Sequence, residues 1–185
     1  MNNLLITGPS RIGKTTILER LATILAESDY LVNGFISPAE LQNGERIAFT
    51  LRTISGRTFT LSQKSGPDFG QQPLKIGNHF VDLTIVDRVM VPMMEEAANN
   101  SDIFLLDEIG PMEIMSLQFR SALSLLLDMP TLVVASISIA PDRYISRIMS
   151  REDVFIVEVD QTNRDLLPQE LAEQVIGMMK QRSAI

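Results

Sequence analysis

An eight-residue stretch near the N-terminus has the residue types and the spacing of a phosphate-binding loop. Residues Gly8 to Thr15 read GPSRIGKT and fill every required position of the pattern G-x-x-x-x-G-K-[ST]. In such a loop the backbone N–H groups face one concavity at the positive end of the following helix, where a polyphosphate can replace water. We expect Lys14 to act as a catalytic group by bringing its charge to the outer phosphates, and the Thr15 hydroxyl to bind Mg²⁺. The predicted nucleotide-binding residues here are Gly8, Pro9, Ser10, Arg11, Ile12, Gly13, Lys14, Thr15 and Thr16.

Arg11 occupies the fourth position of this loop, where glycine is common. A left-handed backbone at that position would strain a residue with a Cβ atom by about 1–2 kcal/mol. The Arg11 side chain can reach over the phosphates or stay in solvent, and the solvated arrangement is the commoner one for a surface arginine.

A pair of acidic residues at the end of a buried strand is the second candidate for chemistry. Ile103 to Leu106 form an apolar run that ends in Asp107 and Glu108. A phosphate loop needs a carboxylate opposite its Ser or Thr hydroxyl to help hold Mg²⁺, and we predict that Asp107 has this role. Glu108 would then lie where a carboxylate can orient or deprotonate water, so we predict that it is catalytic. The alternative is a capped strand end with two solvated acids.

The composition limits the classes of protein to consider. At 185 residues the chain suits one domain, residues 1–185, and its formal net charge of −7 argues against nucleic acid as a partner. The absence of cysteine excludes disulfides, thiolate metal sites and a cysteine nucleophile. No signal peptide or apolar run of membrane-spanning length is visible, so we expect no membrane association and a cytoplasmic location.

The elements that must position these residues alternate between strands and helices. This alternation predicts parallel pairing with right-handed crossovers, and hence an α/β three-layer sandwich with a mostly parallel sheet. Period-two patterning predicts an antiparallel β-hairpin, at about residues 44–63, inserted as structure or as a wall of the nucleotide site. The other expected strands are 4–6, 30–37, 103–106, 131–136 and 154–159; the expected helices are 17–25, 81–99, 116–128, 142–151 and 168–182; and 63–78 is an expected loop.

Two helices and a group of arginines carry more detailed expectations. In helix 81–99, Pro92 should produce a kink or a division, and Leu117 should be among the buried residues of helix 116–128. Arginines at every fourth position from 143 to 151 share one helix face, which could meet phosphate or solvent. No arginine finger can be assigned among Arg11, Arg120, Arg143, Arg147 and Arg164.

Several motifs together resemble the small nucleoside-triphosphatase family known from thermophiles and, in humans, as the cancer-related nucleoside-triphosphatase. They are GKTT in the loop, GF at Gly34, the hairpin, LLDEIGPMEIMS, and NRDLLP from Asn163. The resemblance implies a P-loop fold related to RecA-like ATPases and nucleotide kinases. It also implies slow, Mg²⁺-dependent hydrolysis of nucleoside triphosphates, including ATP and GTP, to diphosphate and phosphate with broad base tolerance. It assigns nucleotide contacts to Phe104, Leu105, Leu106, Asp107, Glu108, Ile109, Gly110 and Pro111.

This chain departs from the family's usual pattern at two places. One is Arg11, and the other is Ile137-Ser138-Ile139, where a basic residue or histidine is usual. Two other functions remain open from the residues alone. The first is a kinase that passes the γ-phosphoryl group of ATP to a nucleotide or polynucleotide hydroxyl. The second is a nucleotide-controlled switch or assembly factor acting on an unidentified protein partner.

Overall fold

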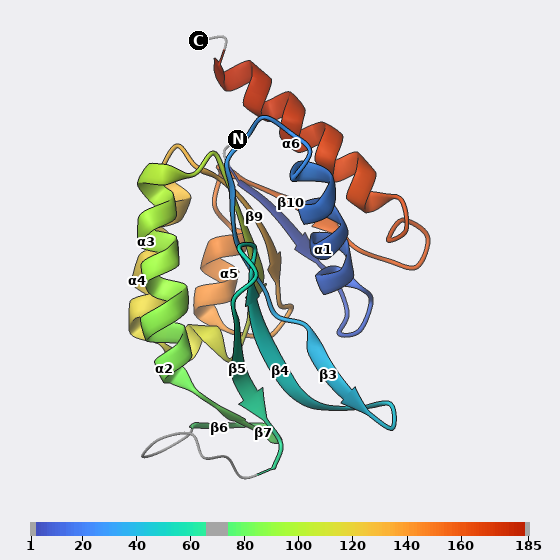
Figure 1. Cartoon of the computed structure of the whole chain (residues 1–185), viewed down its shortest axis with the longest axis vertical. Coiled ribbons are helices and arrows are strands. Elements are labelled where there is room, and N and C mark those ends of the chain that lie inside the picture. Colours follow the sequence, from blue (N-terminus) through green and yellow to red (C-terminus); the bar gives the residue numbers. More distant parts are fainter. Residues whose placement is uncertain (1–2, 66–73, 184–185) are drawn as a thin grey trace.

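A twisted central sheet with helices on both faces forms the protein, as the α/β prediction requires (Figure 1). The computed structural model describes residues 3–65 and 74–183. Within these ranges the sheet has 10 strands in the order β10-β1-β9-β8-β2-β4-β5-β7-β6, and β3 pairs with β4. The strands are β1 Asn3–Thr7, β2 Val32–Ile36, β3 Ala39–Gln42, β4 Glu45–Thr53, β5 Thr58–Gln63, β6 Leu74–Ile76, β7 His79–Val81, β8 Ile103–Ile109, β9 Leu132–Ile137 and β10 Val154–Glu158.

The five strands from β10 to β2 are parallel and make up the core of the sheet. Every residue of β1 and β9 is buried, because helices cover both faces of this region. This explains why these strands read as continuous apolar runs instead of alternating ones. The carboxyl ends of β1, β8 and β9 therefore meet at one edge of the sheet, where the phosphate loop begins.

The helices divide into two layers. Helices α1 and α6 pack on one face, and α3, α4 and α5 pack on the other (Figure 1). No helix in the described part of the chain is long and apolar enough to cross a bilayer. The helices are α1 Lys14–Leu25, α2 Leu83–Ile85, α3 Val91–Asn100, α4 Leu117–Asp128, α5 Arg143–Met149 and α6 Leu167–Ser183, with a π-helical turn at Val86–Met90 and a 3₁₀ turn at Glu113–Met115.

An antiparallel meander of β3, β4 and β5 extends the sheet beyond β2. The predicted hairpin at about 44–63 is confirmed as β4 and β5, and β3 adds a third strand in front of it. Asn43 and Gly44 join β3 to β4 with positive φ values of 52° and 79°. Positive φ at both central residues is the requirement of the two-residue hairpin turns whose twist matches that of the strands.

Three details differ from the expectations. The expected loop 63–78 contains β6, which pairs with β7 through a Gly77 turn, while residues 66–73 lie outside the described part of the chain. The expected helix 81–99 is interrupted by the π-helical turn, and Pro92 lies directly after that turn, in the first turn of α3. Leu117 is 71% exposed, because it is the first residue of α4 after the N-cap Ser116 and its side chain faces solvent.

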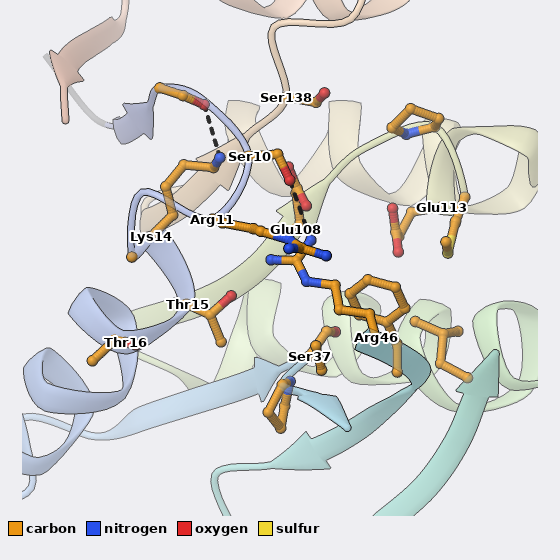
Figure 2. Close-up of a pocket in the computed structure, with 18 of the residues that line it drawn as sticks. Ser10, Arg11, Lys14, Thr15, Thr16, Ser37, Arg46, Glu108, Glu113 and Ser138 are labelled. Carbon is orange, nitrogen blue, oxygen red and sulfur yellow. Dashed lines mark hydrogen bonds between the residues drawn. The ribbon is translucent and has the colours of Figure 1, made fainter. Parts of the chain in front are cut away.

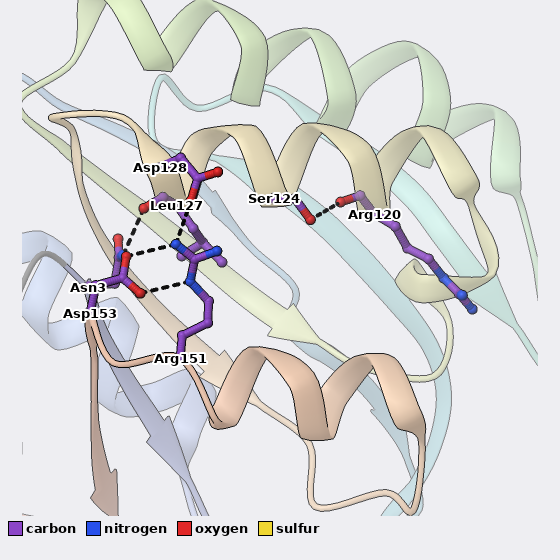
Figure 3. Close-up of polar contacts among 7 residues, drawn as sticks. All are labelled: Asn3, Arg120, Ser124, Leu127, Asp128, Arg151 and Asp153. Carbon is purple, nitrogen blue, oxygen red and sulfur yellow. Dashed lines mark hydrogen bonds and ion pairs between the residues drawn. The ribbon is translucent and has the colours of Figure 1, made fainter.

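Arg151 does not share the helix face expected for it. Helix α5 ends at Met149, and the Arg151 guanidinium forms ion pairs with Asp128 and Asp153 (Figure 3). Asp153 also accepts a hydrogen bond of 3.1 Å from Asn3 Nδ2 at the start of β1. The Arg151 contact keeps the pKa of Asp153 below its ordinary value. This cluster lies at the amino end of β1, the edge of the sheet opposite the phosphate loop, and so cannot meet a phosphate bound there.

Candidate functional site

The phosphate loop connects β1 to α1 and is shaped by two glycines. A Cβ atom on Gly8 would lie 2.7 Å from the carbonyl oxygen of Val159, so a side chain cannot be accommodated there without a shift of the backbone. Gly13 has a φ of 118° and is the N-cap of α1, where it offers no side chain to occupy the N–H groups of the first turn. Arg11 has a φ of 66°, so the left-handed strain considered from the sequence is present.

Lys14 is the first residue of α1 and folds back over its own loop. Its Nζ donates hydrogen bonds of 2.9 Å to the Gly8 carbonyl oxygen and 3.3 Å to the Pro9 carbonyl oxygen. The side chain is only 9% exposed, so its charge is directed into the loop instead of into solvent. A phosphate bound in the concavity would therefore meet a charge that is already in place.

Asp107 lies on β8 directly opposite the loop, and its carboxylate is held by partners from three other elements. One oxygen accepts from Ser136 Oγ on β9 at 2.5 Å, and the other accepts from the Ser37 N–H at 3.2 Å. The Thr15 side chain of α1 is a further neighbour and lowers the pKa of this carboxyl. Burial raises the Asp107 pKa, while these hydrogen bonds and the charge of Lys14 act in the opposite direction. The structure thus brings together the hydroxyl and the carboxylate that the sequence analysis paired.

These two groups fit a magnesium ion. Mg²⁺ prefers hard oxygen ligands and is usually bound by one or two protein oxygens together with waters and substrate phosphates. The Thr15 hydroxyl and the neighbouring Asp107 carboxylate beside the phosphate loop provide such a set. No cluster of three or more metal-ligating His, Cys, Asp or Glu side chains occurs in residues 3–65 and 74–183.

Glu108 and Glu113 form a second acidic pair on the same side of the cavity. Both lie next to Gly110: a Cβ atom placed there would be 3.2 Å from Glu113 Oε2 and 3.4 Å from Glu108 Cδ. Burial and the adjacent Asp107 charge raise the Glu108 pKa. Burial and the charge of Glu108 raise the Glu113 pKa to about 8. Glu113 was not predicted as a site residue, although it belongs to the same DEIGPME tract.

The buried Glu113 carboxyl should make stability depend on pH. Its folded pKa of about 8 exceeds its ordinary value of 4.5, so between these values the folded chain holds a proton that the unfolded chain releases. The free energy of unfolding should therefore fall as pH rises through this window, by at most about 1.4 kcal/mol per pH unit, and level off above it. Urea unfolding at pH 5.5, 7 and 8 measures this slope, and Glu113→Gln should flatten it. Parallel pH curves for wild type and variant would remove Glu113 as the cause.

The loop, the acids and the meander enclose a cavity of about 680 Å³. Figure 2 shows Lys14 and Thr15 on one side, Arg46 and Ser37 on another, and Glu108 between them. Most of the predicted loop residues line this cavity, but Pro9 and Ile12 do not. The residues that line it from the predicted set are Gly8, Ser10, Arg11, Gly13, Lys14, Thr15, Thr16, Glu108 and Pro111.

Part of the predicted stretch on β8 lies in the core instead. Phe104, Leu105, Leu106 and Ile109 are fully buried within the sheet and do not line the cavity, and neither does Gly110. The apolar residues hold the strand in place, so that Glu108 reaches the cavity, whereas Asp107 is 1% exposed and does not line it. Conversely, Ser37, Ser136 and Arg46 were not predicted, because their partners come from other strands.

A second, smaller cavity of about 180 Å³ adjoins the first along α1. The two cavities share Arg11, Gly13 and Thr16, and the second is also lined by Arg20, Arg164 and others. Arg164 belongs to the NRDLLP tract, which the structure therefore brings next to the phosphate loop.

Comparison with known proteins agrees with this geometry. A family profile described as NTPase matches residues 3–172. This chain belongs to the NTPase family. Among the family's named members, the "Nucleoside-triphosphatase THEP1" of Thermotoga sp. (strain RQ2) is 32% identical over 168 residues, which cover 91% of this chain and 92% of that protein. The "Cancer-related nucleoside-triphosphatase" of Homo sapiens is 32% identical over 176 residues, covering 90% of this chain and 93% of that protein.

Solved structures of this NTPase family share the fold. The solution structure of the human cancer-related nucleoside triphosphatase superposes with a TM-score of 0.77 at 28% identity, covering 95% of this chain and 97% of that one. The crystal structure of THEP1 from Aquifex aeolicus gives a TM-score of 0.79 at 23% identity, covering 94% and 98%. The family resemblance noted in the sequence and the predicted α/β P-loop architecture are both confirmed.

Proposed function

We propose that this NTPase catalyses slow, Mg²⁺-dependent hydrolysis of nucleoside triphosphates, including ATP and GTP, to nucleoside diphosphate and phosphate, with broad base tolerance. The observation that carries the proposal is that Lys14, Thr15 and Glu108 line one cavity, which the phosphate loop opens into. The neighbouring Asp107 carboxylate is held in place by Ser136 and Ser37. This arrangement supplies a metal site, a cationic phosphate clamp and a carboxylate for water at one sheet edge.

The reaction is an in-line displacement at the γ-phosphorus. The oxygen of a water molecule forms a new bond to that phosphorus, and the bond to the bridging oxygen breaks, so that its electron pair leaves with the diphosphate. Glu108 orients the water and accepts the proton that the water loses, a role that its raised pKa favours. Lys14 stabilises the charge on the outer phosphate oxygens from the loop. Magnesium held by Thr15 and Asp107 would neutralise part of the same charge.

The nucleoside end of the substrate is proposed to lie in the smaller cavity beside α1. This cavity is lined by Arg11, Arg20, Arg164 and Asp165, among others, and continues from the loop at Thr16. No aromatic ring lines it within the described part of the chain, so a base would meet charged side chains together with Ile12 and Ile17 instead of an aromatic slot. Such a wall discriminates weakly between bases, which supports broad base tolerance.

A phosphate-release panel with a Glu108→Gln variant tests this function. The wild type should release phosphate from all common nucleoside triphosphates with Mg²⁺ and not when the metal is chelated. Glu108→Gln should lower turnover by about tenfold or more, because a positioned base contributes about 10²–10⁴ in rate. It should retain the thermal stabilisation by Mg-ATP that the wild type shows. Turnover unchanged by Glu108→Gln would remove this residue from the mechanism.

A kinase reaction is the second candidate, and the extent of the larger cavity favours it. The cavity continues from the loop to Phe49 of β4, Leu61 of β5 and Ile76 of β6, where an acceptor has room to lie. Added nucleosides, nucleotides or oligonucleotides would then be phosphorylated at the expense of free phosphate. Constant phosphate release without a phosphorylated product would leave hydrolysis as the reaction.

A further inference from the structure

Arg46 is the second residue of β4 and points from the meander into the larger cavity. The two-residue Asn43-Gly44 turn places it near the tip of the meander, across the cavity from the phosphate loop. Figure 2 shows its guanidinium beside Arg11 and Glu108, between the loop and the meander. Arg46 and Arg11 are the two arginines that line this cavity in the described part of the chain, and they approach it from different walls.

The contacts of Arg46 hold it in place without neutralising its charge. Its Nη1 donates a hydrogen bond of 3.2 Å to Ser10 Oγ in the loop, and its guanidinium lies 5.7 Å from the centre of the Phe49 ring. Within residues 3–65 and 74–183 it forms no ion pair with a carboxylate. Burial and the charge of Arg11 lower its pKa, and the charges of Glu108 and Asp107 act against this. A cation of this kind gains most from an anionic ligand between it and the loop.

We propose that Arg46 is the arginine that contacts the γ-phosphoryl group during hydrolysis and stabilises the charge that develops on it. The inference rests on the proposed hydrolysis and names a residue for it. A planar guanidinium with several fixed donors suits a phosphoryl group whose negative charge is spread over its outer oxygens. The meander thus supplies in cis the group that other phosphate-loop enzymes receive from a partner.

The other candidate arginines are occupied elsewhere or face another ligand group. The Arg120 side chain donates to the Ile114 carbonyl oxygen, and its guanidinium lies 5.3 Å from the centre of the Tyr144 ring. Arg143 and Arg147 lie on α5 and line neither cavity. Arg164 lines the smaller cavity, where the nucleoside is proposed to lie. Arg11 is exposed and belongs to the loop itself, so it approaches the phosphates from the same side as Lys14.

The experiment compares Arg46→Ala and Arg46→Lys with Arg57→Ala as a matched control. Arg57 lies in the same meander and also contacts an aromatic ring, with its guanidinium 5.1 Å from the centre of the Phe59 ring, but it does not line the cavity. Arg46→Ala should lower kcat for Mg-ATP by about 30- to 1,000-fold. The lower figure is typical of an arginine within the same chain, and the upper figure is the low end for an arginine that a partner protein supplies. Arg46→Lys should recover only a small part of this loss, because an ammonium cannot reproduce the guanidinium fork. Arg57→Ala should match the wild type.

Two binding measurements separate a transition-state role from a structural one. The affinity for the non-hydrolysable analogue AMPPNP should change by less than about threefold in Arg46→Ala, whereas the extra affinity of ADP with aluminium fluoride over ADP alone should disappear. Equal melting temperatures of Arg46→Ala and Arg57→Ala would show that the fold is intact. A kcat within threefold of wild type, or a loss of AMPPNP affinity as large as the loss of kcat, would overturn the proposal. A wild type that releases no phosphate from any triphosphate would instead overturn the proposed function, and this inference with it.

Discussion

Replacement of Lys14 by alanine should reduce phosphate release by about 10²- to 10³-fold, the loss typical of a donor aimed at developing charge in a water-excluded site. The Lys14 side chain is 9% exposed and is fixed by the carbonyl oxygens of Gly8 and Pro9, so its charge is positioned before any ligand arrives. Unlike Glu108→Gln, Lys14→Ala should also weaken nucleotide binding, because Lys14 contacts the phosphates in the ground state as well as in the transition state. Steady-state phosphate release and calorimetric titration with AMPPNP measure the two effects.

Lys64→Ala provides the matched control for this variant. Lys64 is on the meander and forms an exposed ion pair of 3.3 Å with Glu45, outside the cavity. Its removal should change neither turnover nor nucleotide affinity, since an exposed ion pair contributes about 0–1 kcal/mol to stability and nothing to the site. A Lys14→Ala protein with wild-type turnover would show that the loop does not bind the triphosphate.

Replacement of Gly34 by alanine should lower the free energy of unfolding by more than about 3 kcal/mol, the range of overpacking with backbone displacement. Gly34 pairs with Leu105 across the junction of β2 and β8 and has a φ of 134°. An added Cβ atom would lie 2.0 Å from the Leu105 carbonyl oxygen and 2.7 Å from its nitrogen, so the two strands would have to separate. The same junction brings the Ser37 N–H to the Asp107 carboxylate, and activity should fall together with stability.

Gly177→Ala is the control for this substitution and should raise the free energy of unfolding instead of lowering it. Gly177 lies in α6, and a Cβ atom there would meet nothing within 4 Å. In a helix interior this exchange stabilises by about 0.5–1 kcal/mol, because alanine loses less conformational entropy on folding. Urea unfolding of both variants measures the difference. A Gly34→Ala protein as stable as the wild type would mean that β2 and β8 do not approach as closely as described.

The predicted site residues that the structure brings to one cavity are mainly those whose geometry is local. The phosphate loop is formed by one strand, one turn and one helix in sequence order, so the spacing of Gly8, Gly13 and Lys14 almost determines its shape. Asp107 was identified because an apolar strand delivers its last residues to a sheet edge in any parallel sheet. The family resemblance extended the expected nucleotide contacts further along β8, to residues that are buried and do not line the cavity, because a buried strand exposes only its carboxyl end to a ligand.

The residues that were missed depend on contacts between distant segments. Arg46 reaches Ser10 across 36 positions of sequence, and Ser37 and Ser136 reach Asp107 across 70 and 29 positions. Each contact requires a particular strand order and register, which the period-two pattern of the meander does not specify. The burial of Glu113 likewise follows from the packing of a 3₁₀ turn against the cavity wall.

The sequence alone therefore determined the family, the alternation of strands and helices, the phosphate loop and the acidic strand end. Each of these features depends on residues that lie a few positions apart along the chain. Only the tertiary structure showed that Arg46 lies across the cavity from that loop. It also showed that the Ser136 hydroxyl and the Ser37 N–H hold the Asp107 carboxylate. Those groups meet only after the sheet has assembled in its final order, so that the meander is paired through β2 and β4 with the parallel core.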